Sequence, residues 1–316
     1  MAAPAPIPTV PYKIIADCFR NNTVVPFLGA AASFVGAPKE ASLPSGAAFA
    51  LALAEKAGYP GAMSDPLTKI AQYMEEIPAD RNYLLTTVYE RFFQTIQPGY
   101  KSALTEFLAH IPVAAMPRLI ITTNYDVLVE RTLEERGLSY LAISHIMKGP
   151  KSGRLLCYRN LRDVLASTNV QTLRQTEDYL LEADTDGSQP VLIYKMHGSA
   201  WLRCGGALMD SVVLTENDYI DFFAQDLLNR IPTRILEYLR TSRLLFLGYA
   251  LEDWNFRVLL RKVELVQRHN AESVQRHWAF LLGADPVQVK FWENRGVNLY
   301  EQSLDVVLPS LLQNLL

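Results

Sequence analysis

Two short apolar segments of the chain end in residues that can donate, accept and transfer protons. The segment 118–123 is followed by Asn124 and Asp126, and the segment 191–196 is followed by His197. Both segments are typical of strands buried on two faces, and ligands of open α/β sheets bind beyond the carboxyl ends of such strands. We therefore expect an amide, a carboxylate and an imidazole at one edge of a sheet, in one crevice.

Each of these side chains also has a purely structural interpretation. An imidazole with a pKa near neutrality suits general-base chemistry, but His197 could equally be a hydrogen-bonded residue at a strand end. Asp126 could hold a ribose diol, or it could cap a helix that begins at Val127. Because capping needs only one side chain, Asn124 would then face the crevice. The remaining histidines, interpreted as structural or surface residues, are His110, His145, His269 and His277.

Small residues follow two further apolar segments. The run 24–28 leads into Gly29, Ala30, Ala31, Ala32 and Ser33, and the run 243–247 leads into Gly248 and Tyr249. A glycine there allows the close approach of a pyrophosphate, or simply the tight packing of one turn on its neighbour. The stretch LPSG at 43–46 could cover the same site or merely start a helix, and Asp253 is interpreted as a helix cap.

The order of apolar runs and helical patterns predicts an α/β fold. Strand character is found at 24–28, 118–123, 191–196, 243–247, 278–282 and 297–300. Helical patterns lie between them, at 45–58, 127–137, 285–296 and after residue 255, with Ser45 and Asp285 as caps and Gly58 as a stop. Strands that alternate with helices form a mainly parallel sheet. We expect a Rossmann-like, six-stranded sheet with helices on both faces.

Two intervals are too long for simple crossovers. Residues 59–117 are expected to form a helical module beside the sheet, and residues 138–190, which carry few strand signals, a variable insertion. The Pro-rich start, residues 1–11, is expected to be a flexible arm. The chain 1–316 is thus predicted to be one domain.

The composition argues against a nucleic-acid-binding protein, a zinc or disulfide protein and a membrane protein. A net charge of −3 and a pI of about 6.0 do not favour broad binding to nucleic acid. The three cysteines form no CxxC pair, so the sequence supports neither a thiolate zinc site nor a disulfide framework. No signal peptide is evident, and no apolar stretch approaches the roughly 20 residues that span a membrane. A cytoplasmic protein is expected.

Four motifs in this order resemble the SIR2 (sirtuin) superfamily over roughly residues 20–300. They are GAAAS at 29–33, TTNYD at 122–126, MHGS at 196–199 and LGYALED at 247–253. The forms NYD and KMHGS look most like the bacterial SIR2-like branch that hydrolyses NAD⁺ in anti-phage defence. The four-cysteine zinc ribbon and the GIPDFR segment of deacylating sirtuins have no counterpart here, so the resemblance implies a zinc-independent NAD⁺ hydrolase.

The resemblance also implies a role for each motif. Asn124 would position the ribose and the attacking water, His197 would act as general base, and Asp126 would hold the ribose or stabilise positive charge. The diphosphate would be bound by Gly29, Ala30, Ala31 and Ser33, and the adenosine side by Gly248 and Tyr249. Ala31 stands where sirtuins have a glycine. The alternatives are an NAD-dependent protein deacylase and a non-catalytic NAD or ADP-ribose sensor.

An enzyme that depletes NAD⁺ must stay inactive until it is triggered, for example by oligomerisation or by a partner protein. The resemblance implies a homo-oligomer, with a separately encoded partner such as a HerA-like ATPase or an Argonaute-type protein. The final segment LDVVLPSLLQNLL at 304–316 could pack on its own sheet or leave an apolar stripe for a neighbour.

Overall fold

The sequence folds around one large sheet. The computed structural model describes residues 9–39, 42–162, 169–185, 189–200, 203–204, 207–208, 210–224, 230–251 and 277–316. The strands of the sheet are β1 (Val24–Leu28), β2 (Leu119–Thr122), β3 (Tyr140–His145), β4 (Leu155–Tyr158), β5 (Val170–Gln171), β6 (Val191–Lys195), β9 (Arg243–Leu247), β10 (His277–Phe280) and β11 (Val297–Tyr300). All six predicted strands are present, within two residues of their predicted ends.

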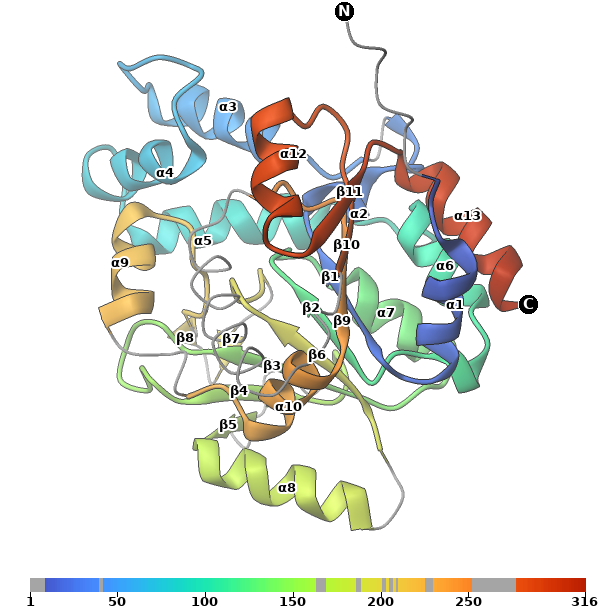
Figure 1. Cartoon of the computed structure of the whole chain (residues 1–316). Coiled ribbons are helices and arrows are strands. Elements are labelled where there is room, and N and C mark those ends of the chain that lie inside the picture. The colour runs from blue at the N-terminus through green and yellow to red at the C-terminus, as the bar shows by residue number, and fades with distance from the viewer. Residues whose placement is uncertain are drawn as a thin grey trace, which may run out of the picture.

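The six predicted strands pair in parallel in the order β6-β2-β1-β9-β10-β11 (Figure 1). Numbered by their succession along the chain, they have the order 3-2-1-4-5-6, which is the order of a Rossmann sheet. The strand order reverses between β1 and β9. The general rule for such sheets places a ligand at this switch point, beyond the carboxyl ends of the strands.

The sheet has nine strands rather than the six expected. The additional strands β3, β4 and β5 come from the interval 138–190, where few strands were predicted. β3 pairs in parallel with β6, while β4 and β5 are antiparallel. In β3 the last two residues, Ser144 and His145, are polar although they are 0% and 2% exposed, so the apolar run is only four residues long. Strand β5 has two residues, and β4 is a run of four, LLCY, within a mixed and polar interval.

Helices cover both faces of the sheet, as predicted. The α-helices are α1 (Tyr12–Arg20), α2 (Ala30–Phe34), α3 (Gly46–Ala57), α4 (Leu67–Glu76), α5 (Arg81–Tyr89), α6 (Ala103–His110), α7 (Leu128–Glu135), α8 (Leu173–Thr185), α9 (Glu216–Ala224), α10 (Thr233–Thr241), α12 (Pro286–Glu293) and α13 (Leu304–Leu315). Shorter elements are the π-helical turn η2 (Glu90–Gln94), the 3₁₀ turn η3 (Val113–Ala115) and a hairpin of β7 (Arg203–Cys204) with β8 (Ala207–Leu208).

Successive residues of β1 point into opposite cores. Val24 and Leu28 join the core beneath α1, α6, α7 and α13, whereas Val25 and Phe27 join the core beneath α10 and α12 (Figure 1). Both faces of the strand are therefore buried, which is why its sequence is a continuous apolar run.

Predicted helix ends agree with the structure. The hydroxyl of Ser45 accepts a hydrogen bond from the backbone of Ala48, and Gly58 ends α3 with φ +58°. Asp285 caps α12 through two backbone N–H groups. The helix predicted after residue 255 and the cap Asp253 lie outside the described residues. No described helix is long and apolar enough to cross a membrane.

A third core belongs to the helical module. It includes Leu43, Phe49 and residues of α4, α5 and η2, so it begins before residue 59. Helix α6, which the prediction included in the module, packs instead on the sheet core beside α13. The leucines of α13 are buried there: Leu304, Leu308, Leu311 and Leu315 are each at most 5% exposed. Of the two interpretations of this segment, packing on its own fold is the correct one.

Candidate active site

Asn124 and His197 occupy equivalent places on neighbouring strands. Thr122 of β2 is paired with Lys195 of β6, and each candidate residue lies two positions beyond its member of this pair. The two following turns are joined as well, because Ala200 N–H donates to the carbonyl of Tyr125. Two strands thus bring these residues to one sheet edge, and their sharing of one crevice stays a prediction.

The amide of Asn124 is fixed by the glycine-containing turn after β1. Its Nδ2 donates to the carbonyl of Gly29 at 2.9 Å and to Ser33 Oγ at 2.7 Å. Both amide hydrogens are thus used within the protein. Asn124 is half-buried and lines a cavity, so its oxygen Oδ1 is the polar atom available to a ligand.

Asp126 precedes Val127, the N-cap residue of α7, and its carboxylate binds the first turn of that helix. Its Oδ1 accepts a hydrogen bond from Leu128 N–H at 3.0 Å, at the start of α7, and its Oδ2 accepts one from Ser33 Oγ at 2.6 Å. Burial raises the pKa of Asp126, against the opposing effects of the Lys195 ammonium and the Ser33 hydroxyl. Asp126 lines the same cavity, but both of its oxygens are already hydrogen-bonded, so a direct contact with ribose remains a prediction.

His197 is buried at the start of the next turn. It is 5% exposed, its ring packs edge-on against Tyr219 at 5.6 Å, and its carbonyl accepts a hydrogen bond from Val213 N–H. Gly198 has φ +77°, and a Cβ there would lie 1.9 Å from the carbonyl oxygen of Ser211. The imidazole is not among the groups that line the cavity at Asn124.

The two glycine turns pack against each other at the switch point. A Cβ on Gly29 would lie 2.4 Å from the Cα of Tyr249, and a Cβ on Gly248, which has φ +63°, would lie 2.6 Å from the backbone nitrogen of Ala32. Backbone hydrogen bonds run from Gly29 to Leu247 and from Ala31 to Gly248. Close packing of the turns therefore accounts for both glycines; their contact with a diphosphate remains a prediction.

The other residues predicted to bind the cofactor differ in their solvent exposure and in whether they line the cavity. Ala30 is exposed and Ser33 is buried, and both line the cavity. Ala31 is half-buried. The ring of Tyr249 is 6% exposed and packs on Phe27 at 4.7 Å, so its side chain belongs to the core rather than to the cavity wall.

The cavity itself has a volume of about 120 Å³. One wall is the turn after β2, from Thr123 to Asp126, and another is formed by Leu43, Pro44 and Gly46. The stretch 43–46 therefore lines this cavity and also starts α3. The residues that sequence reasoning missed are apolar side chains of the helical module, namely Phe49, Leu67 and Phe92. Apolar residues on helices give no sequence signal that separates a cavity wall from an ordinary core.

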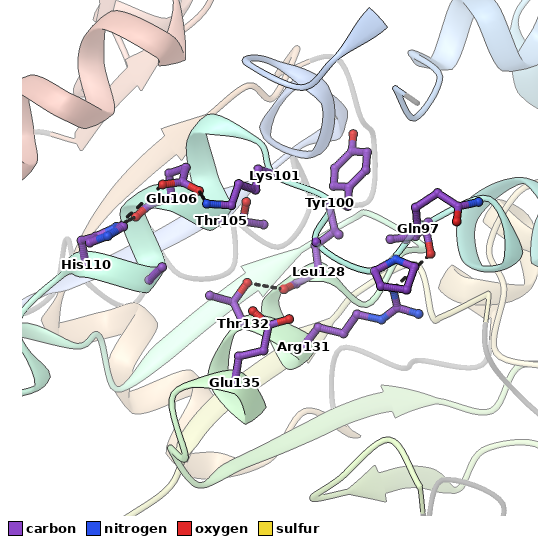
Figure 2. A pocket seen from close by; sticks show the side chains of 14 residues that line it. Gln97, Tyr100, Lys101, Thr105, Glu106, His110, Leu128, Arg131, Thr132 and Glu135 are labelled. Atoms are coloured by element: carbon purple, nitrogen blue, oxygen red, sulfur yellow. Dashed lines mark hydrogen bonds and ion pairs between the residues drawn. The ribbon is translucent and has the colours of Figure 1, made fainter. Parts of the chain in front are cut away.

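A larger cavity of about 400 Å³ lies between α6 and α7, and none of the predicted site residues is among the described residues that line it (Figure 2). Three of its charged groups are engaged: Lys101 pairs with Glu106 at 2.8 Å, and Arg131 donates to the carbonyl of Ile96. Tyr100 lines this cavity, and its hydroxyl donates at 2.8 Å to the carbonyl of Ser33, which lines the smaller cavity. The smaller cavity therefore holds the candidate chemistry.

The described residues include no cluster of His, Cys, Asp or Glu that could hold a metal ion. His145 and His277 are buried and structural, as predicted: His145 contacts the hydroxyl of Tyr194 at 3.0 Å, and His277 accepts a hydrogen bond from Leu244 N–H. Burial also raises the pKa of the Cys157 thiol to about 12, so this thiol is not a nucleophile.

Comparison with known proteins agrees with the motifs. The family model of the SIR2-like domain matches residues 118–300, a span that contains Asn124, Asp126, His197 and Gly248. The protein named Defense-associated sirtuin 2, from Bacillus subtilis, is 25% identical over 245 residues, which are 75% of this chain and 19% of the relative. This chain thus corresponds to a small part of the relative's length. Since the family match extends over more than half of the sequence, the chain belongs to the SIR2-like domain family.

Proposed function

We propose that the protein is an NAD⁺ glycohydrolase, which cleaves the bond between nicotinamide and ribose to give nicotinamide and ADP-ribose. The observation that carries the proposal is the hydrogen-bonded unit of Asn124, Ser33 and Asp126 at the cavity, beside the switch point of a Rossmann sheet. Membership of the SIR2-like family supports NAD⁺ as the substrate.

The reaction sets clear requirements for the protein. A water oxygen bonds to C1′ of the ribose while the bond from C1′ to the nicotinamide nitrogen breaks, and nicotinamide leaves with that electron pair. NAD⁺ and water thus give nicotinamide, ADP-ribose and one proton. The transition state resembles an oxocarbenium ion, as in glycoside hydrolysis. The site must therefore orient the water, accept its proton and stabilise positive charge.

The named residues can meet these requirements. Asn124 Oδ1 would accept a hydrogen bond from the water or a ribose hydroxyl, because the amide hydrogens hold the side chain in one orientation. Asp126 would act through its negative charge rather than by contact, since both oxygens are hydrogen-bonded. His197, at the neighbouring strand end, would take the proton from the water or through a ribose hydroxyl.

The volume of the cavity limits which part of NAD⁺ it can hold. Sites for drug-sized ligands are about 300–1,000 Å³, so a cavity of about 120 Å³ is too small for the whole cofactor and would take only part of its nicotinamide end. The diphosphate would then pass over Gly29, Ala30, Ala31 and Ser33, towards Gly248 and Tyr249.

Product analysis tests the proposal. The purified protein is incubated with NAD⁺, alone and with an acyl-lysine peptide, and nicotinamide, ADP-ribose and deacylated peptide are separated by chromatography. We expect nicotinamide and ADP-ribose without peptide, and no stoichiometric zinc by metal analysis. Turnover that strictly requires the peptide would instead identify a deacylase. Binding of NAD⁺ without any release of nicotinamide would identify a sensor.

The name of the Bacillus subtilis relative places that protein in defence. We propose that this chain, too, is an NAD⁺-depleting effector of anti-phage defence, active as a homo-oligomer with a separately encoded partner such as a HerA-like ATPase or an Argonaute-type protein. Because the α13 leucines are buried, the oligomer surface would lie elsewhere. Light scattering and NADase assays over a dilution series test this: full activity in a monodisperse monomer would refute it.

A further inference from the structure

Arg81, the first residue of α5, uses all five of its N–H donors. Nε and Nη2 form a fork on the carboxylate of Asp210, at 2.8 and 2.9 Å. Nη1 donates to Asp218 at 2.8 Å and to Glu75 at 2.9 Å, and Nη2 also donates to the backbone carbonyl of Val212 at 2.7 Å. A guanidinium satisfied in this way holds its partners in one geometry.

A second cation also belongs to this cluster, so that two cations face three carboxylates. Lys148 lies 2.9 Å from Asp218 and 3.3 Å from Glu75. The side chain of Arg81 is only 16% exposed, and that of Asp218 is 0% exposed. Ion pairs with so little exposure lose much hydration, so the cluster is not an incidental surface contact. It joins helices α4 and α5 of the helical module to the segment 210–213.

The segment 210–213 lies directly against both candidate catalytic turns. Val213 N–H donates to the carbonyl of His197 at 3.1 Å, and the hydroxyl of Tyr125 donates to the carbonyl of Val213 at 2.7 Å. Ser199 N–H donates to Ser211 Oγ at 3.2 Å. Arg81 thus holds, through Val212, the backbone that supports His197 on one side and the turn containing Asn124 on the other.

We propose that Arg81 is a positioning residue, which acts through the segment 210–213 to fix His197 relative to Asn124. This inference rests on the proposed NAD⁺ glycohydrolase activity. Arg81 does not line the cavity, so the proposal predicts an effect on kcat rather than on KM. A displacement of about 1 Å in a catalytic group costs on the order of 100-fold in rate. Loss of the guanidinium is therefore expected to lower kcat by about 10- to 100-fold.

Chemical rescue distinguishes positioning from simple destabilisation. Arg81→Ala leaves a partly exposed space lined by three carboxylates, which free guanidinium ion can occupy at sub-denaturing concentration. We expect kcat to recover with guanidinium but not with an equal ionic strength of NaCl. The control is Arg136→Ala, which also removes hydrogen bonds to two backbone carbonyls, those of Leu108 and Ile111, away from the site. It should lower stability without lowering kcat, and guanidinium should not stimulate it.

A second measurement is independent of turnover. The ring protons of His197 are assigned by NMR with His197→Gln, and their chemical shifts are compared in wild type, Arg81→Ala and Arg136→Ala. We expect a shift only in Arg81→Ala, reversed by guanidinium. If wild type releases no nicotinamide, the proposed function fails while this spectrum still decides the role of Arg81.

If Arg81→Ala does not fold, Arg81→Lys provides an alternative test of the proposal. It keeps a positive charge among the carboxylates but loses the fork and the simultaneous contact with Val212. A reduced kcat with an unchanged KM, together with a shifted His197 signal, is expected. Folded Arg81→Lys or Arg81→Ala with the kcat and the His197 spectrum of wild type would overturn the proposal.

Discussion

The ammonium group of Lys195 donates to the backbone carbonyl of Asp126 at 2.6 Å. The residue two positions before His197 is therefore bound to the residue two positions after Asn124. Lys195 is 1% exposed and also pairs with Glu130 at 3.0 Å, so a buried ion pair lies directly behind the two candidate catalytic turns.

Lys195→Met should destabilise the protein strongly. It leaves the carboxylate of Glu130 buried without its cation, a change that typically costs about 3–5 kcal/mol. Lys195→Met combined with Glu130→Leu should cost less than Lys195→Met alone, because the Glu130 carboxylate is then not left without its cation. Urea unfolding measures both. Lys101→Met, at an exposed pair with Glu106, is the control and should change stability little; a similar loss there would contradict the argument.

Asn124→Ala and His197→Ala should each reduce nicotinamide release by at least about 100-fold, the size of effect expected of a general base or an orienting group. Both changes also affect stability, because Asn124 makes two side-chain hydrogen bonds and His197 is buried. A loss of about 1–3 kcal/mol is expected. Melting curves recorded beside the assays show whether each variant is folded. Near-normal turnover of either folded variant would place the chemistry elsewhere.

Ser33→Ala tests the hydroxyl that connects the site. Ser33 accepts a hydrogen bond from Asn124 and donates one to Asp126, so its loss should free the Asn124 amide and lower kcat. The reduction should be smaller than for Asn124→Ala. Ser102→Ala removes another buried hydroxyl, which donates to the carbonyl of Ala32, and serves as the control. Equal losses of kcat in both serine variants would mean that the turn is merely disordered by either change.

Ala31→Gly should leave the KM for NAD⁺ unchanged. A Cβ built on Gly248 would meet the Cβ of Ala31 at 2.8 Å, so the alanine methyl faces the neighbouring turn rather than the space for a diphosphate. Gly248→Ala should instead destabilise, by about 1–3 kcal/mol, because of the positive φ and the close backbone. Steady-state kinetics and thermal unfolding test the pair. A marked fall of KM in Ala31→Gly would show that the methyl obstructs the cofactor.

Acid should weaken the fold in a defined window. Burial lowers the pKa of His145 and His277 to about 4, from an ordinary value of 6.5. Between these values the unfolded chain binds more protons than the folded one. The free energy of unfolding therefore falls as pH decreases from about 6.5 to about 4, on the order of 1.4 kcal/mol per pH unit for each ring. In His145→Gln this contribution to the slope should be halved; an unchanged slope would exclude that ring.

Local patterns predicted the parallel core well, because strands buried on both faces are continuous apolar runs. Strand β3 was missed since its apolar run is only four residues long and is followed by the polar residues Ser144 and His145, which are nevertheless buried. His145 behaves as a core residue only because its ring is neutral and contacts the hydroxyl of Tyr194, a residue on another strand. The residues near His145 in the sequence do not predict its contact with Tyr194.

The candidate active site, like the fold, could be predicted only in part from local sequence patterns. Asn124 and His197 could be placed together because the ends of parallel strands share one sheet edge. The cavity wall formed by Phe49 and Phe92 could not be predicted, since apolar residues on helices look alike in any setting. Arg81 and Asp210 are 129 residues apart in the sequence, and only the folded chain shows that they form a fork.

The packing of α1 on α13 makes the first and last described helices one cooperative unit. Tyr12 bonds to Gln302, Arg20 donates to the carbonyl of Asn314, and Phe19 and Leu308 are both 0% exposed in the same core. Neither helix can open without exposing the apolar face of the other. Backbone amides at opposite ends of the sequence should consequently exchange with solvent deuterium at a common rate, set by a single opening event.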